Sequence, residues 1–309
     1  MMKKILFTGG GGAGSEYVAR KWTDKYIMYF ADANIGSISP SIKDDRKISI
    51  PMANSSNFIE EILFICKEKK IDILVPGVDE ELSLISKYHD KNEWPQIMVP
   101  QKFFVDIMLD KYQCFEELRN NDFVIPKTYL LKDAYKLDFP IIVKPRSGRG
   151  SRGVVTLNNL SQIDAYLSLY GGDYDDYIAQ ELIQGQEYTV FVSANKEGKL
   201  CAVIPIKVEL KKGITILAEI DFVPEIYEYI SRFQSFFQAQ SIYNFQCILT
   251  NDRVVMPFEV NPRISTTFCL AISTGFDPIE SFDLCDIDIP TFFPEKKISL
   301  RRDWINFIN

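Results

Sequence analysis

Short apolar runs alternate with turns and amphipathic segments over the first hundred residues. The segment "KKILFTGGGGAGSEYVARKW" (3–22) predicts a strand, a glycine-rich turn and a helix, and "IDILVPGVDEELSLISKY" (71–88) repeats that order. A further extended run precedes Asp32 in "FADAN". Alternation of strands with helices is typical of a parallel sheet covered by helices, so we expect an α/β lobe here.

The glycine run after the first predicted strand has two interpretations. Gly9, Gly11 and Gly14 match a dinucleotide-binding fingerprint only loosely, because they sit inside a run of glycines that fits many patterns. An oxidoreductase would use this run with Asp32 on the ribose, but that hypothesis leaves residues 140–263 unexplained. The alternative is a tight strand-to-helix turn that lets the backbone approach a substrate or a neighbouring lobe.

The pattern changes near residue 100. A helix is predicted over 106–120, and it should end close to Pro126, because the residue before a proline favours an extended conformation. We therefore place a domain boundary near residue 100.

The segment "FPIIVKPRSGRGSRGVVTL" (139–157) places a basic, glycine-rich loop between two predicted strands. Glycines let backbone N–H groups turn toward an anion, and cationic side chains add charge. The glycines are Gly148, Gly150 and Gly153, and the cations are Lys144, Arg146, Arg149 and Arg152. This predicts a phosphate-binding lid, although not a Walker A loop, because no GK[ST] follows. The alternative is a mobile basic hairpin without a ligand.

The segment "YIAQELIQGQEYTVFVSAN" (177–195) predicts an extended run, a turn at Gly185 and a strand opened by Glu187. Such a linker can present backbone groups to an adenine edge, and the carboxylate of Glu187 can accept hydrogen bonds from ribose hydroxyls. Without neighbours, a glutamate that opens a strand is usually just solvated.

The segment "YNFQCILTNDRVVMPFEVNPRIST" (243–266) predicts a hairpin with its turn at 251–252 and Gln246 opposite Glu259. Side chains alternate along a strand, so Glu259, Asn261 and Arg263 should share one face. Oxygen ligands of this kind suit Mg²⁺, and an arginine beside them can hold an anionic intermediate. The alternative is a surface strand with one polar face, which the surrounding apolar residues make less attractive.

Composition narrows the class of protein. The chain has 309 residues, 46% hydrophobic and 25% charged, with a net charge of −7 and no long basic run, which disfavours nucleic acid or an anionic membrane as partner. No apolar run reaches the twenty or so residues of a membrane span, and six cysteines without a CxxC pair suit a reducing compartment, so we expect a cytoplasmic protein. The one histidine, His89, lies outside every motif, which disfavours a Ser-His-Asp hydrolase.

In combination, these motifs resemble the ATP-grasp superfamily, and most closely its carbamoyl-phosphate-synthase-like branch. The resemblance covers nearly the whole chain and is carried by "IIVKP", "FEVNPR" and the order of the residues between them. It implies a Rossmann-like pre-ATP-grasp lobe over 1–100 and a two-lobed ATP-grasp domain over 101–309, α/β and α+β in class. Within that domain it implies a lid over about 112–183 and a metal-binding C-terminal part over about 184–309.

The resemblance also implies a role for each motif residue. Lys111 and Lys144 would contact ATP phosphates, the backbone near Glu181, Leu182 and Ile183 would read adenine, and Glu187 would take the ribose. The loop that closes over the phosphates would use Ser147, Gly148, Gly150, Ser151 and Gly153. Gln246, Glu259 and Asn261 would hold Mg²⁺, with Mn²⁺ as a possible substitute. Arg263 would steady an acyl phosphate and, with Lys144, carry the catalysis.

The activity implied is ATP-dependent joining of a small-molecule carboxylate to an amine, with a possible homodimer as the assembly. One grasp module instead of two favours a stand-alone ligase over carbamoyl phosphate synthesis. A carboxylase that uses bicarbonate and a non-catalytic nucleotide sensor remain as alternatives. The acceptor pocket would lie between the lobes, where Gly11, Gly12, Asp79 and Glu80, or Lys207 and Lys211, could contact substrate. Whether Arg149 and Arg152 touch a co-substrate is left open.

Overall fold

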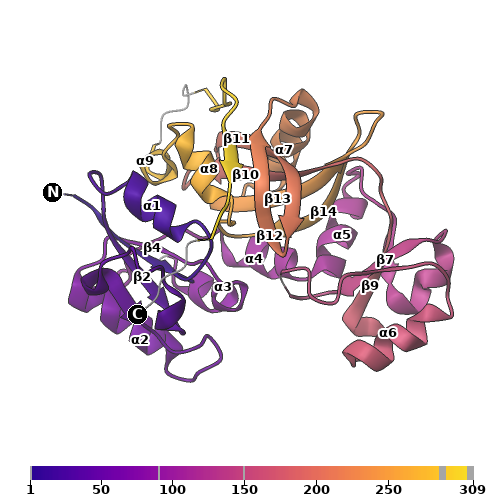
Figure 1. The fold of residues 1–309 in the computed structure, drawn as a ribbon, viewed down its shortest axis with the longest axis horizontal. Helices are drawn as coiled ribbons and strands as arrows, with labels where there is room; N and C mark the ends of the chain where they lie inside the picture. Colours follow the sequence, from indigo (N-terminus) through magenta and orange to yellow (C-terminus); the bar gives the residue numbers. More distant parts are fainter. Residues whose placement is uncertain (1, 90, 149, 285–289, 305–309) are drawn as a thin grey trace.

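The computed structural model describes residues 2–89, 91–148, 150–284 and 290–304, which form three sheets. Figure 1 shows an N-terminal lobe at one end, a lid with α6 at the other, and a large antiparallel sheet between them. The predicted combination of an α/β lobe with two α+β lobes is confirmed. Among the described residues, no helix is long and apolar enough to cross a membrane.

The N-terminal lobe is a parallel five-stranded sheet in the order β3-β2-β1-β4-β5, covered by three α-helices. Its strands are β1 (Lys4–Thr8), β2 (Ile27–Asp32), β3 (Lys47–Ser49), β4 (Ile73–Val75) and β5 (Gln96–Ile97). Its α-helices are α1 (Ser15–Lys21), α2 (Phe58–Lys69) and α3 (Asp79–Ile85), with short 3-10 turns at Ile35–Ser37, Asp44–Arg46 and Ser86–Tyr88. The strand order changes direction between β1 and β4, the point at which open α/β sheets form a binding crevice at their carboxyl ends.

The central sheet has the order β14-β13-β10-β11-β12-β15, and each neighbouring pair is antiparallel. Its strands are β10 (Gln186–Ala194), β11 (Leu200–Lys212), β12 (Ile214–Ile220), β13 (Ser241–Leu249), β14 (Val255–Asn261) and β15 (Ser299–Arg301). The helices that accompany it are α4 (Lys102–Leu109), α5 (Lys111–Asn120), α7 (Pro224–Phe237), α8 (Phe268–Ser273) and α9 (Pro278–Phe282).

The lid sheet has the order β6-β9-β7-β8. Its strands are β6 (Thr128–Leu130), β7 (Ile141–Pro145), β8 (Val155–Leu157) and β9 (Tyr177–Glu181), accompanied by α6 (Gln162–Tyr170) and 3-10 turns at Leu131–Lys136 and Tyr174–Asp176. The lid has its own hydrophobic cluster, which includes Leu131, Ile141 and Tyr166. The helix α5 instead packs into a cluster with α4 and α7 through Phe115 and Leu118. The lid bounds of 112–183 and the boundary near residue 100 stay predictions.

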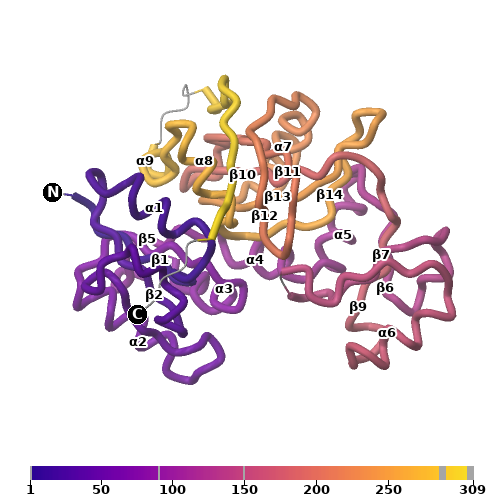
Figure 2. Tube along the Cα trace, in the orientation of Figure 1, coloured from indigo at the N-terminus to yellow at the C-terminus, as the bar shows by residue number. Residues whose placement is uncertain are grey.

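The N-terminal lobe and the central sheet share one hydrophobic cluster, in which Phe7 and Phe30 of the lobe join Phe191 and Phe268 of the central part. Figure 2 follows the chain from the indigo lobe through the magenta lid to the orange central sheet, with the yellow C-terminal segment beside that sheet. The last strand, β15, pairs with β12. The crevice between the N-terminal lobe and the central sheet is therefore built on a continuous core.

The helix predicted over 106–120 is wrong in one respect, because two helices meet there. Asp110 has an extended backbone and caps α5, and its Oδ1 accepts the backbone N–H groups of Tyr112 and Gln113 at 3.0 and 3.3 Å. The N-cap residue of a helix has non-helical backbone angles, so a continuous helix cannot run through Asp110. Lys111 is consequently the first residue of α5, at a fixed point beside the lid.

Candidate active site

A cavity of about 330 Å³ lies between the lid and the central sheet. Most of the residues predicted for nucleotide binding line it: Lys111, Lys144, Gly148, Ser151, Glu181, Ile183 and Glu187. Its apolar walls include Ile142 of β7 and Met256 and Phe258 of β14. A slot with apolar walls and lysines beside it suits a flat base attached to phosphates.

Lys144 is a buried lysine that lines this cavity, only 5% exposed. Its Nζ donates to Oε1 of Gln180 at 2.9 Å and to the carbonyl oxygen of Phe258 at 2.7 Å. The pKa of Lys144 is lowered to about 7, chiefly by burial, which Glu259 opposes and the charge of Lys111 reinforces. Two neutral acceptors hold the ammonium in place, and its charge lacks a directly bound anion.

Lys111 and Glu259 form an ion pair across the floor of the cavity, with Nζ 3.0 Å from Oε1. The same Nζ donates to the carbonyl oxygen of Gly148 in the lid loop at 3.0 Å. Burial pushes the pKa of Glu259 upward, but the positive charges of Lys111 and Lys144 outweigh it and hold that pKa below its usual value. Glu259 is therefore a carboxylate, ion-paired with Lys111 and within the electrostatic influence of Lys144.

The three predicted metal ligands lie together on the β13–β14 hairpin. The register pairs Gln246 with Glu259, as predicted for a turn at 251–252, and it also pairs Asn244 with Asn261. Nε2 of Gln246 is 3.3 Å from Oε2 of Glu259. Asn261 is 7% exposed, and its side-chain amide has no hydrogen-bond partner among the described residues. One carboxylate and two amide oxygens on one face make a donor set that fits Mg²⁺.

The lid loop divides into residues that face the cavity and residues that hold the loop. Gly148 and Ser151 line this cavity, Gly150 lines a second cavity that is described below, and Ser147 lines neither. Gly153, at φ +71°, packs on Pro145, and its carbonyl oxygen accepts the hydroxyl of Tyr166 at 2.7 Å. Arg152 lines both cavities, and Arg149 lies outside the described residues.

Arg146 does not serve as a free cation of the lid. Its Nη2 and Nε donate to the two carboxylate oxygens of Asp110 at 2.6 and 3.2 Å, and Nη1 donates to the carbonyl oxygen of Asp175 at 3.0 Å. The backbone N–H of Lys111 also donates to the carbonyl oxygen of Arg146 at 2.9 Å. The guanidinium of Arg146, which the sequence assigned to phosphate binding, instead fixes the start of α5 to the lid strand. The sequence carries no local signal for this contact.

The segment predicted to read adenine is anchored at its start. The backbone N–H of Glu181 donates to the carbonyl oxygen of Lys127 at 2.9 Å, and Oε2 of Glu181 accepts the N–H of Lys127 at 3.2 Å. Ile183 lines the cavity, and Leu182 is not among its lining residues. Oε1 of Glu187 accepts Nζ of Lys211 at 2.7 Å.

A second cavity of about 890 Å³ lies between the N-terminal lobe and the central sheet, at the carboxyl ends of β1 and β4. Of the residues considered for an acceptor pocket, Gly12, Glu80 and Lys211 line it. Lys207 does not line it, and its Nζ lies 3.7 Å from Oε1 of Glu219. Five residues line both cavities: Ser151, Arg152, Glu187, Lys211 and Glu259.

The glycine run and Asp32 fix the turn after β1. Oδ2 of Asp32 accepts the N–H of Gly11 at 3.0 Å, and Oδ1 accepts the N–H of Asn34 at 2.9 Å. A Cβ on Gly14 would lie 3.1 Å from the carbonyl oxygen of Thr266, just before α8. The run thus permits close approach to a neighbouring lobe, and Asp32 is occupied by backbone amides where a dinucleotide ribose would need it.

Arg263 lies where the second cavity meets the N-terminal lobe. Its Nε donates to Oδ1 of Asp79, and its Nη1 donates to the carbonyl oxygen of Ile264 at 2.8 Å. Asp79, considered from sequence as a cavity residue, is instead the partner of Arg263. The two are 184 positions apart, so no spacing rule could have found the pair.

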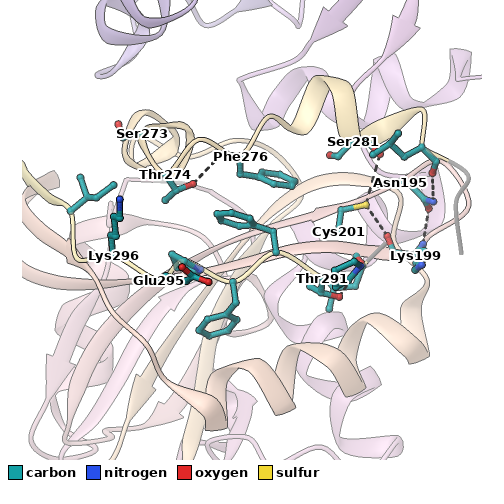
Figure 3. A pocket seen from close by; sticks show the side chains of 17 residues that line it. Asn195, Lys199, Cys201, Ser273, Thr274, Phe276, Ser281, Thr291, Glu295 and Lys296 are labelled. Atoms are coloured by element: carbon teal, nitrogen blue, oxygen red, sulfur yellow. Dashed lines mark hydrogen bonds between the residues drawn. The ribbon is translucent and has the colours of Figure 1, made fainter. Parts of the chain in front are cut away.

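Another cavity, of about 880 Å³, is lined by Phe276, Cys201 and Thr291 among others, and Figure 3 shows them around it. It shares no lining residue with the two cavities above. We assign it no function.

Comparison with known proteins agrees with this geometry. A family model described as the ATP-grasp domain matches residues 108–267, and one described as the PylC-like N-terminal domain matches residues 5–99. Formate-dependent phosphoribosylglycinamide formyltransferase of Bacteroides fragilis is 25% identical over 220 residues, 66% of this chain and 54% of that protein. D-alanine--D-alanine ligase of Petrotoga mobilis is 29% identical over 100 residues, 31% of this chain and 33% of that protein.

Among solved structures, the biotin carboxylase domain of 2-oxoglutarate carboxylase from Hydrogenobacter thermophilus, in complex with MgADP, ADP and bicarbonate, superposes with a TM-score of 0.69. It is 16% identical, and the superposition covers 91% of this chain and 69% of that one. At this identity the likeness establishes the fold alone. The chain spans about half the length of the matched formyltransferase and about a third of the matched ligase.

Proposed function

The chain belongs to the ATP-grasp family, and from this premise we propose that it is an ATP- and Mg²⁺-dependent ligase. It would activate a small-molecule carboxylate as an acyl phosphate and join it to an amine, releasing ADP and phosphate. The observation that carries the proposal is the meeting of the two cavities at Glu259. A nucleotide in one cavity would direct its γ-phosphoryl group into the other, where an acceptor of small-molecule size has room.

The nucleotide would enter with its base between Ile142 and Met256 and its phosphates toward Lys111 and Lys144. Both lysines have protein partners that a phosphate oxygen can replace. A desolvated ammonium gains more from an anion than a hydrated one does, because the surrounding dielectric is low. The buried lysines therefore favour binding of the triphosphate over binding of a neutral nucleoside.

Gln246, Glu259 and Asn261 would hold Mg²⁺, and Mn²⁺ is a proposed substitute. When bound, the ion supplies charge neutralisation for the phosphates. In its absence, Lys111 neutralises Glu259, so nucleotide and metal would enter a site whose carboxylate is already ionised.

The chemistry we propose has two displacements. A carboxylate oxygen of the acceptor attacks the γ-phosphorus, and the bond from that phosphorus to the ADP oxygen breaks. The amine nitrogen then attacks the acyl carbon, phosphate leaves, and the nitrogen loses a proton to solvent. Neither step needs a protein nucleophile, so positioning and charge carry the catalysis. Arg152, Lys211 and Arg263 line the second cavity and would favour its anionic contents.

The test is ADP release from Mg·ATP across a matrix of amino acids and other small carboxylates, each paired with small amines, with mass spectrometry of active wells. We expect release that requires both components and a product whose mass equals their sum minus water. ADP release with bicarbonate and no organic carboxylate would replace the proposal with a carboxylase. Stabilisation by Mg·ATP without turnover in any well would favour a nucleotide sensor.

A further inference from the structure

The guanidinium of Arg263 is only partly used by its protein partners. Nε donates to Asp79 and Nη1 donates to the carbonyl oxygen of Ile264 at 2.8 Å. A guanidinium carries five N–H donors in a fixed plane. Within the described part of the chain, Nη2 has no hydrogen-bond partner, and Arg263 lines the second cavity together with Glu259 and Asn261. The unused N–H groups therefore remain for a ligand in that cavity.

Asp79 follows a turn that is anchored to the N-terminal sheet. It is the first residue of α3, and the preceding turn packs on the end of β1. The backbone N–H of Gly77 donates to Oγ1 of Thr8 at 3.0 Å, and Thr8 in turn donates to the buried carboxylate of Glu81. A Cβ on Gly77 would lie 2.5 Å from the carbonyl oxygen of Thr8, so the turn has no room to shift.

The pair is also largely removed from solvent. The side chains of Arg263 and Asp79 are 15% and 11% exposed. A buried ion pair is costly to desolvate and contributes little net stability compared with apolar residues of the same size. Such a pair is better explained by what it orients than by the stability it adds.

We propose that Asp79 is a positioning residue for Arg263. By holding the Nε edge of the guanidinium, it turns the unused N–H groups toward the oxygens of the transferring phosphoryl group beside Glu259. The N-terminal lobe thereby takes part in phosphoryl transfer without touching the nucleotide. This inference rests on the proposed function.

The test uses a probe that needs no acceptor substrate. Mg·ADP with aluminium fluoride mimics a phosphoryl group in transfer, and such mimics bind an active site more tightly than the ground state. Affinities for Mg·ADP and for Mg·ADP with aluminium fluoride are measured by calorimetry for the wild type, Asp79→Asn, Arg263→Gln and the double variant. Asp44→Asn, which removes an exposed acid of the same lobe, is the matched control.

We expect Asp79→Asn to keep its Mg·ADP affinity and to lose about tenfold to a hundredfold in affinity for the fluoride complex, the size of a misdirected charged hydrogen bond. Because Asp79 acts through Arg263, the double variant should match Arg263→Gln alone. Additive losses would mean a merely structural role and would overturn the inference. An affinity of Asp79→Asn for the fluoride complex equal to that of the wild type would also overturn the inference.

If Asp79→Asn does not fold, Asp79→Glu provides the same comparison, because its longer carboxylate keeps the charge but displaces the guanidinium. Undiminished binding of the fluoride complex by Asp79→Glu would then refute the positioning role. A wild-type protein that binds Mg·ADP no more tightly with aluminium fluoride would overturn the proposed phosphoryl transfer itself, and the inference with it.

Discussion

The buried ammonium of Lys144 predicts that nucleotide affinity depends on pH. Burial lowers the pKa of this lysine to about 7. The groups that act on it electrostatically are Lys111, Glu259 and Cys114, and burial also raises the pKa of Cys114, so that this thiol stays neutral. Phosphate oxygens bound next to Nζ stabilise the charged form, and nucleotide binding must therefore raise the pKa of Lys144.

The sign and the size of the change in nucleotide affinity with pH follow from this linkage. Above pH 7 the free protein carries mostly neutral Lys144, so binding takes up a proton and affinity falls as the pH rises. With a pKa of about 7, the protonated fraction drops from about one quarter at pH 7.5 to about one hundredth at pH 9. The expected loss of affinity over this range is about 25-fold, or about 2 kcal/mol.

Calorimetry of Mg·ATP binding at pH 7.5, 8.2 and 9, in two buffers of different ionisation enthalpy, measures the affinity and the number of protons taken up on binding. We expect uptake of about one proton at pH 9 and the stated fall in affinity. Lys144→Met, which keeps the apolar part of the side chain, should bind weakly but with no dependence on pH over this range. Wild-type affinity that stays constant from pH 7.5 to 9, or proton uptake that persists in Lys144→Met, would refute the reasoning.

Three further predictions concern turnover and stability. Glu259→Gln should lower Mg²⁺-dependent ADP release at least about a hundredfold, in the range of losing a preorganised charge; unchanged turnover would remove Glu259 from the site. Asp110→Ala should lower the free energy of unfolding in urea by at least about 1–2 kcal/mol, because it removes the α5 cap and the contact with Arg146, whereas the exposed Asp44→Ala should change it little; equal effects would contradict the structural role of Asp110. Gly185→Ala should destabilise by more than about 1 kcal/mol, because its Cβ would lie 2.3 Å from a carbonyl oxygen at φ +155°, and it should exceed Gly171→Ala, where φ is +73° but no atom lies within 4 Å.

The parts of the site that the sequence predicts are those set by local geometry. The β13–β14 hairpin follows from a polar turn and from alternation along the strands, and it pairs Gln246 with Glu259 as expected. The strand that carries Lys144 is likewise determined by the apolar residues before it. In both cases, a period of two residues and a turn of known length fix which side chains share a face.

The contacts that the sequence does not predict join distant segments. The ion pairs of Asp79 with Arg263 and of Asp110 with Arg146 depend on how whole lobes pack, and each partner by itself reads as a solvated charge or a helix end. Local pattern also predicted one helix where Asp110 separates two, because the apolar period continues across the break while the cap depends on a side-chain contact. Long-range packing decides these points.

The charges around Glu259 suggest why the nucleotide cavity is built this way. Lys111 pairs with this one carboxylate, and the lowered pKa of the buried Lys144 reflects mainly the cost of removing its charge from water, to which the charge of Lys111 adds. A triphosphate brings negative charge to this site, so its attraction to Lys144 offsets part of the free energy that burying the charged lysine costs. A neutral nucleoside lacks this charge and cannot offset that cost. Adenosine should therefore bind with the same affinity at pH 7.5 and 9, and a dependence like that of ATP would show that the titrating group lies elsewhere.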